Sequence, residues 1–278
     1  MKKNFKIGVI GLGVVGKQIY NWLKKKKVPA LGYDKFKNIG KIEEIRETDI
    51  IFLCLPTPFK ENRGADLSAL KENLNFFKDL KDKIFVIKST VPPKTTEAFQ
   101  KTFKNHYFLI NPEFLREADP LATFLYPDLQ IIGYTKKSKK YASLILKLLP
   151  NGKYNAVIPA TEAEVIKYTV NAFLATKVIF ANQIYDLCSK IGADYETVRR
   201  VIEHEARIGR SHLEIFHQGY RGFGGKCLPK DLENLIHFCK SLNIQPELFL
   251  TVDKINLRLL KSQRLLKKLY RDWLNNKS

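Results

Sequence analysis

The chain has 278 residues, of which 45% are hydrophobic, so it can form a packed core in two domains, or in one large domain with an extension, and is not a disordered chain. Its net charge of +20 would suit an anionic partner. The lysines are scattered, however, and lack the aromatic interleaving of single-strand binders, so we attribute the charge to a lysine-rich composition and expect no nucleic-acid partner.

The cysteines exclude two kinds of site. Their positions are 54, 188, 227 and 239, which match neither the spacing of metal ligands nor a paired disulfide framework. We therefore expect no metal site and a reducing, cytoplasmic setting. No apolar run is long enough for a membrane span. The apolar start "IGVIGLGVVG" is interrupted by glycines, and no small-residue cleavage site follows, so it is not read as a signal peptide.

The first half alternates apolar runs with helical patterns. Strands are predicted over 5–13, 28–34, 48–58, 83–90, 106–114 and 128–134. Helices are predicted over 16–27, which the lysine run 24–27 closes, and over 66–80, with Asp66 as N-cap. This alternation predicts a Rossmann-type, doubly wound, mainly parallel α/β sheet in a domain spanning residues 1–157.

The second half has helical spacing. We predict helices over 161–191, 194–209, 231–244 and 251–274, with a glycine-rich loop between the second and the third. Residues 158–278 are therefore expected to form an all-helical domain that carries this loop.

A dinucleotide site is predicted at the first strand–helix turn. The residues from Gly11 to Gly16, including Gly13, Val14 and Val15, follow the G-x-G-x-x-G pattern, and Asp34 ends the next strand eighteen residues later. The helix N-terminus favours a pyrophosphate, and the acidic residue favours ribose hydroxyls and repels a 2′-phosphate. NAD is the expected cofactor; the alternative is a glycine-rich turn without a ligand.

Hydroxyl groups follow two later strands. Pro56 and Thr57 end the third strand, and Ser89 and Thr90 end the fourth. Strand ends of such a sheet line the cofactor crevice, so these residues are predicted to contact ribose or nicotinamide. The alternative is ordinary turn capping by Ser and Thr.

Cys227 lies in "GFGGKCLPKD", residues 222–231, where a thiol is set among glycines and charged residues. It has three interpretations: a reactive nucleophile, a metal ligand, for which partner ligands at suitable spacing are lacking, or a small residue in a tight turn. Nearby cations at Arg221, Lys226 and Lys230 would favour a thiolate. Cys54, Cys188 and Cys239 lie in apolar or helical segments and are interpreted as structural.

Four segments occur together in order: "KSTVPPKTTE" from residue 88, "NPEFLREADP" from 111, "EAEVIKYTVNAFLATK" from 162, and "GFGGKCLPKD". Their combination resembles the UDP-glucose/GDP-mannose dehydrogenase family from residue 5 to about residue 255. The resemblance implies oxidation of a nucleotide-sugar C6 alcohol to the acid with two NAD⁺. The expected substrate is UDP-glucose, giving UDP-glucuronate for polysaccharide synthesis.

The resemblance also implies roles for individual residues. Cys227 would trap the aldehyde and carry a thioester. Lys167 and Asn171, one helical turn apart, would stabilise the oxyanion. Asp231 would order a water, although it also suits an N-cap. Glu113 would be the base for hydrolysis, and Glu117 with Thr90 would hold water and nicotinamide.

The substrate set implied by the family comprises Phe114, Leu115, Arg116, Glu117, Lys167, Asn171, Arg207, Phe223, Gly224 and Cys227. Arg207 would reach the substrate across a homodimer built on the 161–191 helix. Family members of typical length add a second α/β domain that holds the nucleotide. We expect that domain to be absent here. The sequence therefore does not show which base the nucleotide of the substrate carries.

Two other functions stay open. A 3-hydroxyacid dehydrogenase would share the Rossmann domain, the helical domain and a lysine–asparagine helix, but it would perform one oxidation without a thiol. A non-catalytic NAD-binding protein would keep the dinucleotide site alone.

Overall fold

The structure of the chain is a computed structural model that describes residues 5–116 and 118–269. The chain divides into two units. Unit 1 is Met1–Thr57 with Asp66–Lys167, and unit 2 is Pro58–Ala65 with Tyr168–Ser278. This division falls inside a long helix, whereas the boundary predicted at residue 157 relied on the change from strands to helices. That boundary stays a prediction.

Unit 1 contains a seven-stranded sheet in the order β2-β1-β3-β6-β7-β8-β9. The strands are β1 Ile7–Ile10, β2 Ala30–Tyr33, β3 Ile50–Leu53, β6 Ile84–Ile87, β7 Tyr107–Ile110, β8 Leu129–Tyr134 and β9 Tyr154–Pro159. Neighbouring strands are parallel except β7 and β8. The predicted doubly wound, mainly parallel sheet is confirmed.

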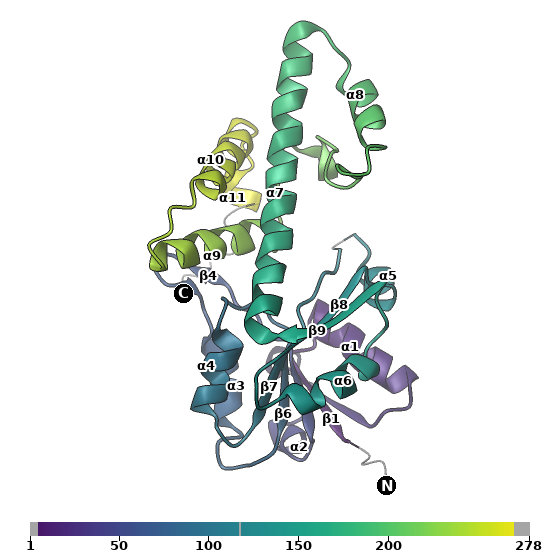
Figure 1. Ribbon diagram of the computed structural model, residues 1–278, viewed down its shortest axis with the longest axis vertical. Coiled ribbons are helices and arrows are strands. Elements are labelled where there is room, and N and C mark those ends of the chain that lie inside the picture. Colours follow the sequence, from purple (N-terminus) through teal and green to yellow (C-terminus); the bar gives the residue numbers. More distant parts are fainter. Residues whose placement is uncertain (1–4, 117, 270–278) are drawn as a thin grey trace. The chain divides into compact units, whose positions relative to one another are not determined.

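Helices cover both faces of this sheet (Figure 1). They are α1 Val14–Lys25, α2 Ile42–Arg46, α3 Ser68–Asn75, α4 Thr95–Thr102, α5 Pro120–Leu125, α6 Lys139–Leu148 and the start of α7 Ala160–Ile191. Because strand side chains alternate, Ile50 and Phe52 pack in a core with α1, α5 and α6, while Ile51 and Leu53 pack with α2, α3, α4 and α7. Because both faces of the sheet are buried, the sequences of its strands are continuous apolar runs.

The N-terminus of α3 differs by one residue from the prediction. Leu67, not Asp66, is the N-cap residue. Asp66 Oδ1 instead accepts a hydrogen bond from Ser68 N at 3.0 Å, which forms a local turn ahead of the helix. Lysines of the run 24–27 end α1 as predicted, because Lys24 and Lys25 lie in its last turn, although the helix spans Val14–Lys25 instead of 16–27.

Glu164, the fifth residue of α7, is a buried carboxyl group that caps α4. Its Oε1 accepts hydrogen bonds from Thr96 N at 2.8 Å and Thr96 Oγ1 at 2.7 Å, and its Oε2 accepts one from Lys94 N at 2.6 Å. α4 has no side-chain cap from its own N-cap residue, Lys94. A carboxyl group distant in sequence therefore satisfies the backbone donors at this terminus.

Glu164 is expected to make stability depend on pH. Burial raises its pKa from 4.5 to about 7, so the folded chain binds the proton more tightly than the unfolded chain does. The resulting stabilisation is complete below pH 4.5 and is lost as pH rises through 7, a change of about 3 kcal/mol in the free energy of unfolding. Urea unfolding from pH 4.5 to 8 measures it.

The matched variants are Glu164→Gln, which should flatten this pH dependence, and Glu162→Gln, an exposed glutamate in the same turn, which should preserve it. An equal pH dependence in both variants would rule out Glu164 as its source.

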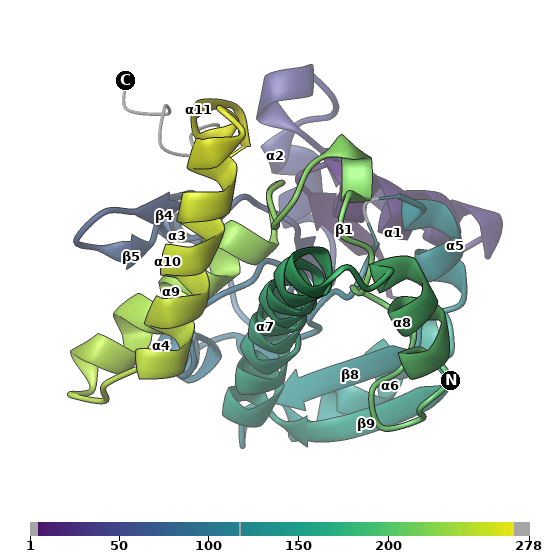
Figure 2. The same cartoon turned by 90° about the horizontal axis from the view of Figure 1, so that it is seen from above.

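Unit 2 is built on the rest of α7. Its elements are the hairpin β4 Phe59–Lys60 and β5 Gly64–Ala65, the helices α8 Tyr195–Ile202, α9 Leu228–Ser241, α10 Glu247–Ser262 and α11 Leu266–Leu269, and a short 3-10 turn, His217–Gly219. One core joins α7 to α9 and α10, which lie beside it in Figure 2, and another joins α7 to α8. The predicted helical second half is confirmed, with a two-stranded hairpin added to it.

The hairpin belongs to unit 2 through α9. The ring of Phe59 packs edge-on against His237 at 6.3 Å between centroids. A Cβ on Gly64 would lie 2.6 Å from His237 Nδ1, so the hairpin needs a glycine at this close approach. The two strands have two residues each, too short for a periodic signal, and we did not predict them from the sequence.

Three helices of the second half have boundaries that differ from prediction. α8 ends at Ile202 instead of continuing to Gly209, and a side-chain nitrogen of His204 binds the Arg200 carbonyl at its end. The helix predicted over 251–274 starts at Glu247 and breaks after Ser262, where Arg264 has φ of 59°. Its last residues, from 270 on, lie outside the described part. α9 starts at Leu228, three residues before the predicted Asp231.

In the described residues, no helix combines the length and the apolar character needed to cross a membrane. The same part of the chain holds no cluster of three or more His, Cys, Asp or Glu side chains suited to a metal ion.

Candidate functional site

The glycine-rich turn has the shape that a dinucleotide requires. A Cβ on Gly16 would lie 1.8 Å from Gly11 O, so the turn can pass this close to the helix only with glycine there. A Cβ on Gly13 would meet no atom within 4 Å, so this position is open. Gly13 is the N-cap of α1, and Val14 and Val15 begin the helix. The open space at a helix N-terminus fits the pyrophosphate of NAD.

Asp34 is fixed at the end of β2 by backbone donors. Its Oδ2 accepts a hydrogen bond from Leu12 N at 2.8 Å, and its Oδ1 accepts from Phe36 N and Lys37 N, both at 3.1 Å. The carboxylate therefore ties the glycine-rich turn to β2 and keeps one lone pair, on Oδ2, for a ribose hydroxyl. Lys37, which we did not predict, donates from Nζ to Leu12 O at 2.6 Å.

Asp34→Ala is expected to weaken NAD⁺ binding by about tenfold, because the turn loses its anchor and the ribose loses an acceptor. NADP⁺ should lose less, since the repulsion of its 2′-phosphate is removed as well. Dissociation constants for both dinucleotides, measured by calorimetry on wild type and variant, check this. An unchanged ratio of the two constants would contradict the role of Asp34 in discrimination.

The hydroxyl groups at the strand ends bind backbone in the structure. Ser89 Oγ donates to Leu55 O at 2.6 Å, and Thr57 Oγ1 donates to Thr90 O at 2.6 Å. Both contacts match turn capping. Pro56 is exposed beside them, and the roles of these residues and of Thr90 toward NAD stay predictions.

The buried Lys167 and the half-buried Glu113 form a pair in unit 1. Lys167 is 5% exposed, and its Nζ lies 3.6 Å from Glu113 Oε1. Glu113 Oε2 accepts a hydrogen bond from Leu115 N at 2.7 Å, and the Phe114 ring centroid lies 5.4 Å from Lys167 Nζ. The partner that a buried lysine needs is thus the carboxylate of the "NPEFL" segment.

The next two residues of that segment, Arg116 and Glu117, are not part of this pair. Arg116 is exposed, and its guanidinium lies 3.3 Å from Asp128. Glu117, predicted for both cofactor and catalysis, lies outside the described residues.

Asn171 and Asp231 form a buried pair in unit 2. Asn171 Nδ2 donates to Asp231 Oδ2 at 2.5 Å, and Lys230 Nζ contacts Asp231 Oδ1. The interpretation of Asp231 as N-cap is wrong, since its carboxylate binds these two side chains inside the first turns of α9. The structure therefore brings together two of the predicted residues, Asn171 and Asp231.

Cys227 is exposed and occupies the N-cap position of α9, where its carbonyl accepts a hydrogen bond from Asp231 N at 2.9 Å. The positive end of the helix dipole favours a thiolate at this position. Two of the cations that we expected to favour a thiolate at Cys227 are paired with carboxylates. Lys230 contacts Asp231, and Arg221 lies 2.6 Å from Asp186. The helix terminus is thus a source of positive potential that the sequence-based argument missed.

The other cysteines have different surroundings. Burial raises the pKa of Cys54 to about 12 and also raises that of Cys239, which keeps both as thiols. Cys188 is buried in the core between α7 and α8.

The glycine-rich loop is held by hydrogen bonds to Asn256 of α10. Phe223 N donates to Asn256 Oδ1 at 2.8 Å, and Asn256 Nδ2 donates to Phe223 O at 2.9 Å. Gly222 has φ of +88°, and a Cβ there would lie 2.6 Å from Asn256 Oδ1. At Gly224 a Cβ would lie 2.8 Å from the Tyr220 hydroxyl. The chain's own packing thus explains Gly222 and also Gly224, which the family resemblance places in the substrate set.

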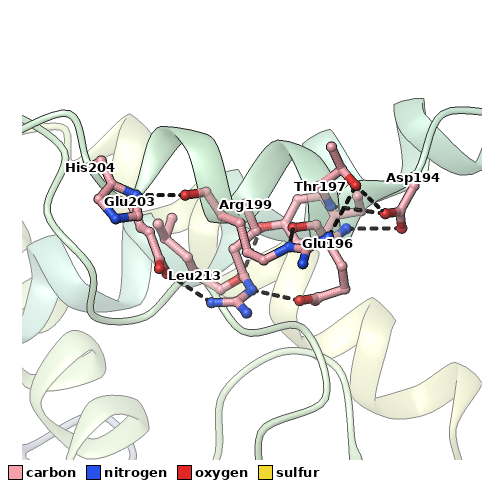
Figure 3. A network of polar contacts seen from close by, with 9 residues as sticks. Asp194, Glu196, Thr197, Arg199, Glu203, His204 and Leu213 are labelled. Atoms are coloured by element: carbon pink, nitrogen blue, oxygen red, sulfur yellow. Dashed lines mark hydrogen bonds and ion pairs between the residues drawn. The ribbon is translucent and has the colours of Figure 1, made fainter.

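The segment that carries Arg207 follows α8. Figure 3 shows the polar network of this helix, in which Asp194 caps the N-terminus and Arg199 binds both Glu196 and Glu203. Arg207 itself is exposed and lies 2.9 Å from Glu205.

The fold and these sites define a dinucleotide-binding α/β protein whose helical unit presents an exposed cysteine at a helix N-terminus. The NAD-binding-domain model of the UDP-glucose/GDP-mannose dehydrogenase family matches residues 33–149, and the central-domain model matches 161–258. The chain belongs to the UDP-glucose/GDP-mannose dehydrogenase family. NAD, the predicted cofactor, is confirmed by the first of these domains.

Individual relatives agree with this assignment. The chain is 36% identical over 222 residues to UDP-glucose 6-dehydrogenase of Rickettsia bellii, covering 77% of this chain and 50% of the relative. It thus spans about half the length of the curated relatives it matches. A UDP-glucose dehydrogenase structure from Pyrobaculum islandicum has a TM-score of 0.80 and 26% identity, covering 96% of this chain and 72% of that one.

A 3-hydroxyisobutyrate dehydrogenase from Mycobacterium tuberculosis shares the fold alone. Its TM-score is 0.75 at 15% identity, over 92% of this chain and 94% of that one.

Proposed function

We propose that the chain carries out the NAD-dependent oxidation of a nucleotide-sugar C6 alcohol to the uronic acid, with UDP-glucose as the substrate and UDP-glucuronate as the product. The observation that carries this proposal is Cys227 at the N-terminus of α9, one turn before the buried Asp231–Asn171 pair. A single oxidation to an aldehyde needs no thiol, whereas oxidation to an acid needs the aldehyde to be trapped. The names of the curated relatives support UDP-glucose.

The residues of the chain would act in turn. When bound, NAD⁺ accepts one hydride from C6 in each of the two oxidations. Between them, Cys227 Sγ adds to the aldehyde carbon, and the oxygen takes up negative charge that Lys167 and Asn171 stabilise. Loss of the second hydride leaves a thioester on Cys227. Water then attacks its carbonyl, the C–S bond breaks, and the thiolate is released with the acid.

Two carboxylates suit the hydrolytic step. Glu113, held by Leu115 N and Lys167, would accept a proton from the attacking water. Asp231 would order that water beside the thioester. Glu117 with Thr90 would complete the water and nicotinamide network.

Counting the NADH made per sugar tests this function. With limiting UDP-glucose and excess NAD⁺, the proposal expects two NADH and one UDP-glucuronate per UDP-glucose consumed. GDP-mannose serves as the comparison substrate, because the family includes both sugars. No turnover with any nucleotide sugar would refute the proposal.

The second candidate is a single oxidation of a 3-hydroxyacid, which the shared fold of the 3-hydroxyisobutyrate dehydrogenase favours. It predicts one NADH per substrate and turnover that survives loss of the thiol. A non-catalytic NAD-binding protein would bind NADH and turn over neither substrate.

A homodimer through α7 is part of the proposal, as the way in which Arg207 would reach the substrate of the partner. Phe173, Phe180 and Leu187 are 62%, 54% and 54% exposed and stand seven residues apart, so they form one apolar stripe. Such a stripe on a long helix fits a second copy of the same helix.

Phe180→Glu is expected to convert the dimer to a monomer, because it places a charge in the middle of the stripe. Sedimentation velocity measures the mass of the particle. Phe76→Glu, at an exposed phenylalanine of unit 1, is the control and should leave the mass unchanged. A wild type that is monomeric at all concentrations would refute this assembly.

A further inference from the structure

Lys88 is a buried cation that the function proposed above does not use. It follows β6 directly and is 6% exposed. Its Nζ donates a hydrogen bond to Asn111 Oδ1 at 2.7 Å. An ammonium group held by a neutral amide in the interior is costly, so its presence there suggests a role that an apolar side chain could not fill.

The amide of Asn111 is locked in the orientation that faces Lys88. Asn111 Nδ2 donates to Gln130 Oε1 at 2.8 Å and to Ile131 O at 2.7 Å. Gln130 Nε2 in turn donates to Pro150 O at 2.9 Å, which fixes the direction of the Gln130 amide. Asn111 Oδ1 therefore has to point to Lys88, and the lysine anchors the start of the segment that carries Glu113.

Lys88 also shares a pocket with residues of the proposed site. Lys88, Asn111 and Glu113 line it together with Leu115 and with Val15 of the glycine-rich turn. All of them belong to unit 1, so the pocket runs from the predicted cofactor turn to the predicted base.

The titratable groups that face Lys88 lie on three elements. Glu113, which follows β7, favours its charged form, Lys167 of α7 opposes it, and Cys54, which follows β3, is the third group. Burial keeps Cys54 a thiol, so Cys54 brings no negative charge to Lys88. Burial also lowers the pKa of Lys88 from 10.5 to about 8, so Lys88 loses its positive charge in mildly alkaline solution.

We propose that Lys88 is a positioning residue for the oxidation: its ammonium holds Asn111 so that Glu113 meets Lys167, and it adds positive charge beside them. This inference rests on the proposed function. The added charge favours the negative oxygen that develops at C6 when the thiolate adds and when water attacks. Activity then depends on Lys88 being protonated.

The test compares wild type, Lys88→Arg and Lys88→Met by kcat with UDP-glucose from pH 6.5 to 10. Arginine keeps its charge throughout, so the ratio of the Lys88→Arg rate to the wild-type rate should rise as pH passes 8. Lys88→Met should be slower than wild type by about tenfold or more at pH 7, with the difference shrinking above pH 8. Ratios that do not change with pH would mean a structural role alone and would overturn the proposal.

A second measurement does not need activity. Between pH 8 and 10.5 the unfolded chain binds the Lys88 proton and the folded chain has released it, so the stability of wild type relative to Lys88→Met should rise with pH. A constant difference would overturn the assigned charge state. A wild type without turnover would instead refute the proposed function, while this measurement would still decide when Lys88 changes charge.

Discussion

Replacing Cys227 with serine is expected to lower the steady-state rate of NADH formation from UDP-glucose and NAD⁺ by about 10³-fold or more. A serine hydroxyl at the N-terminus of α9 is not ionised and cannot form the thioester through which the second oxidation would pass. The measurement is NADH absorbance together with chromatographic detection of UDP-glucuronate.

Cys239→Ser is the matched control. Cys239 lies on the same helix, and burial raises the pKa of its thiol, so its loss should leave the rate near that of wild type. The proposed mechanism would be wrong if Cys227→Ser kept more than a tenth of the wild-type rate while both variants bound NADH equally well.

Replacing Lys167 with methionine is expected to lower kcat by about 10²-fold, the usual effect of removing one group that stabilises an oxyanion. Methionine fills a similar volume, but it leaves Glu113 without the cation that now lies 3.6 Å away. Steady-state kinetics with UDP-glucose separates kcat from KM for this variant.

Lys190→Met is the control for Lys167, since Lys190 is an exposed lysine in the last turn of the same helix. Its kinetics should match those of wild type. If Lys167→Met raised KM and left kcat unchanged, Lys167 would bind ground state and transition state equally, and its role in stabilising the oxyanion would have to be abandoned.

The sheet and the dinucleotide turn could be predicted because their signals are local. Strands such as Ile50–Leu53 are buried on both faces, so they read as unbroken apolar runs between turn residues. The need for glycine at Gly16 comes from a contact within one strand–helix unit, because a Cβ there would lie 1.8 Å from Gly11 O. Short-range geometry of this kind can be predicted from a few consecutive residues of the sequence.

Helix ends were predicted less well, because periodicity shows which face of a helix is buried and not its first or last residue. α8 stops at Ile202, although helical spacing continues to Gly209, where φ is +70°. α9 starts at Leu228 because proline is tolerated in a first helical turn, and this places Cys227 at the N-cap. The interpretation of Asp231 as that cap failed because Asn171, sixty residues earlier, holds its carboxylate.

By itself, the sequence determined the parallel sheet, the dinucleotide turn and the family, because these depend on periodicity and on motifs of a few residues. Only the tertiary structure decided what the charged side chains face. In the structure, Lys88 is buried against Asn111 and Glu113 is paired with Lys167. Arg221, which we expected to act on Cys227, is paired with Asp186. A polar side chain can be satisfied by many partners of the right chemistry, so its partner is chosen by packing between segments far apart in the chain.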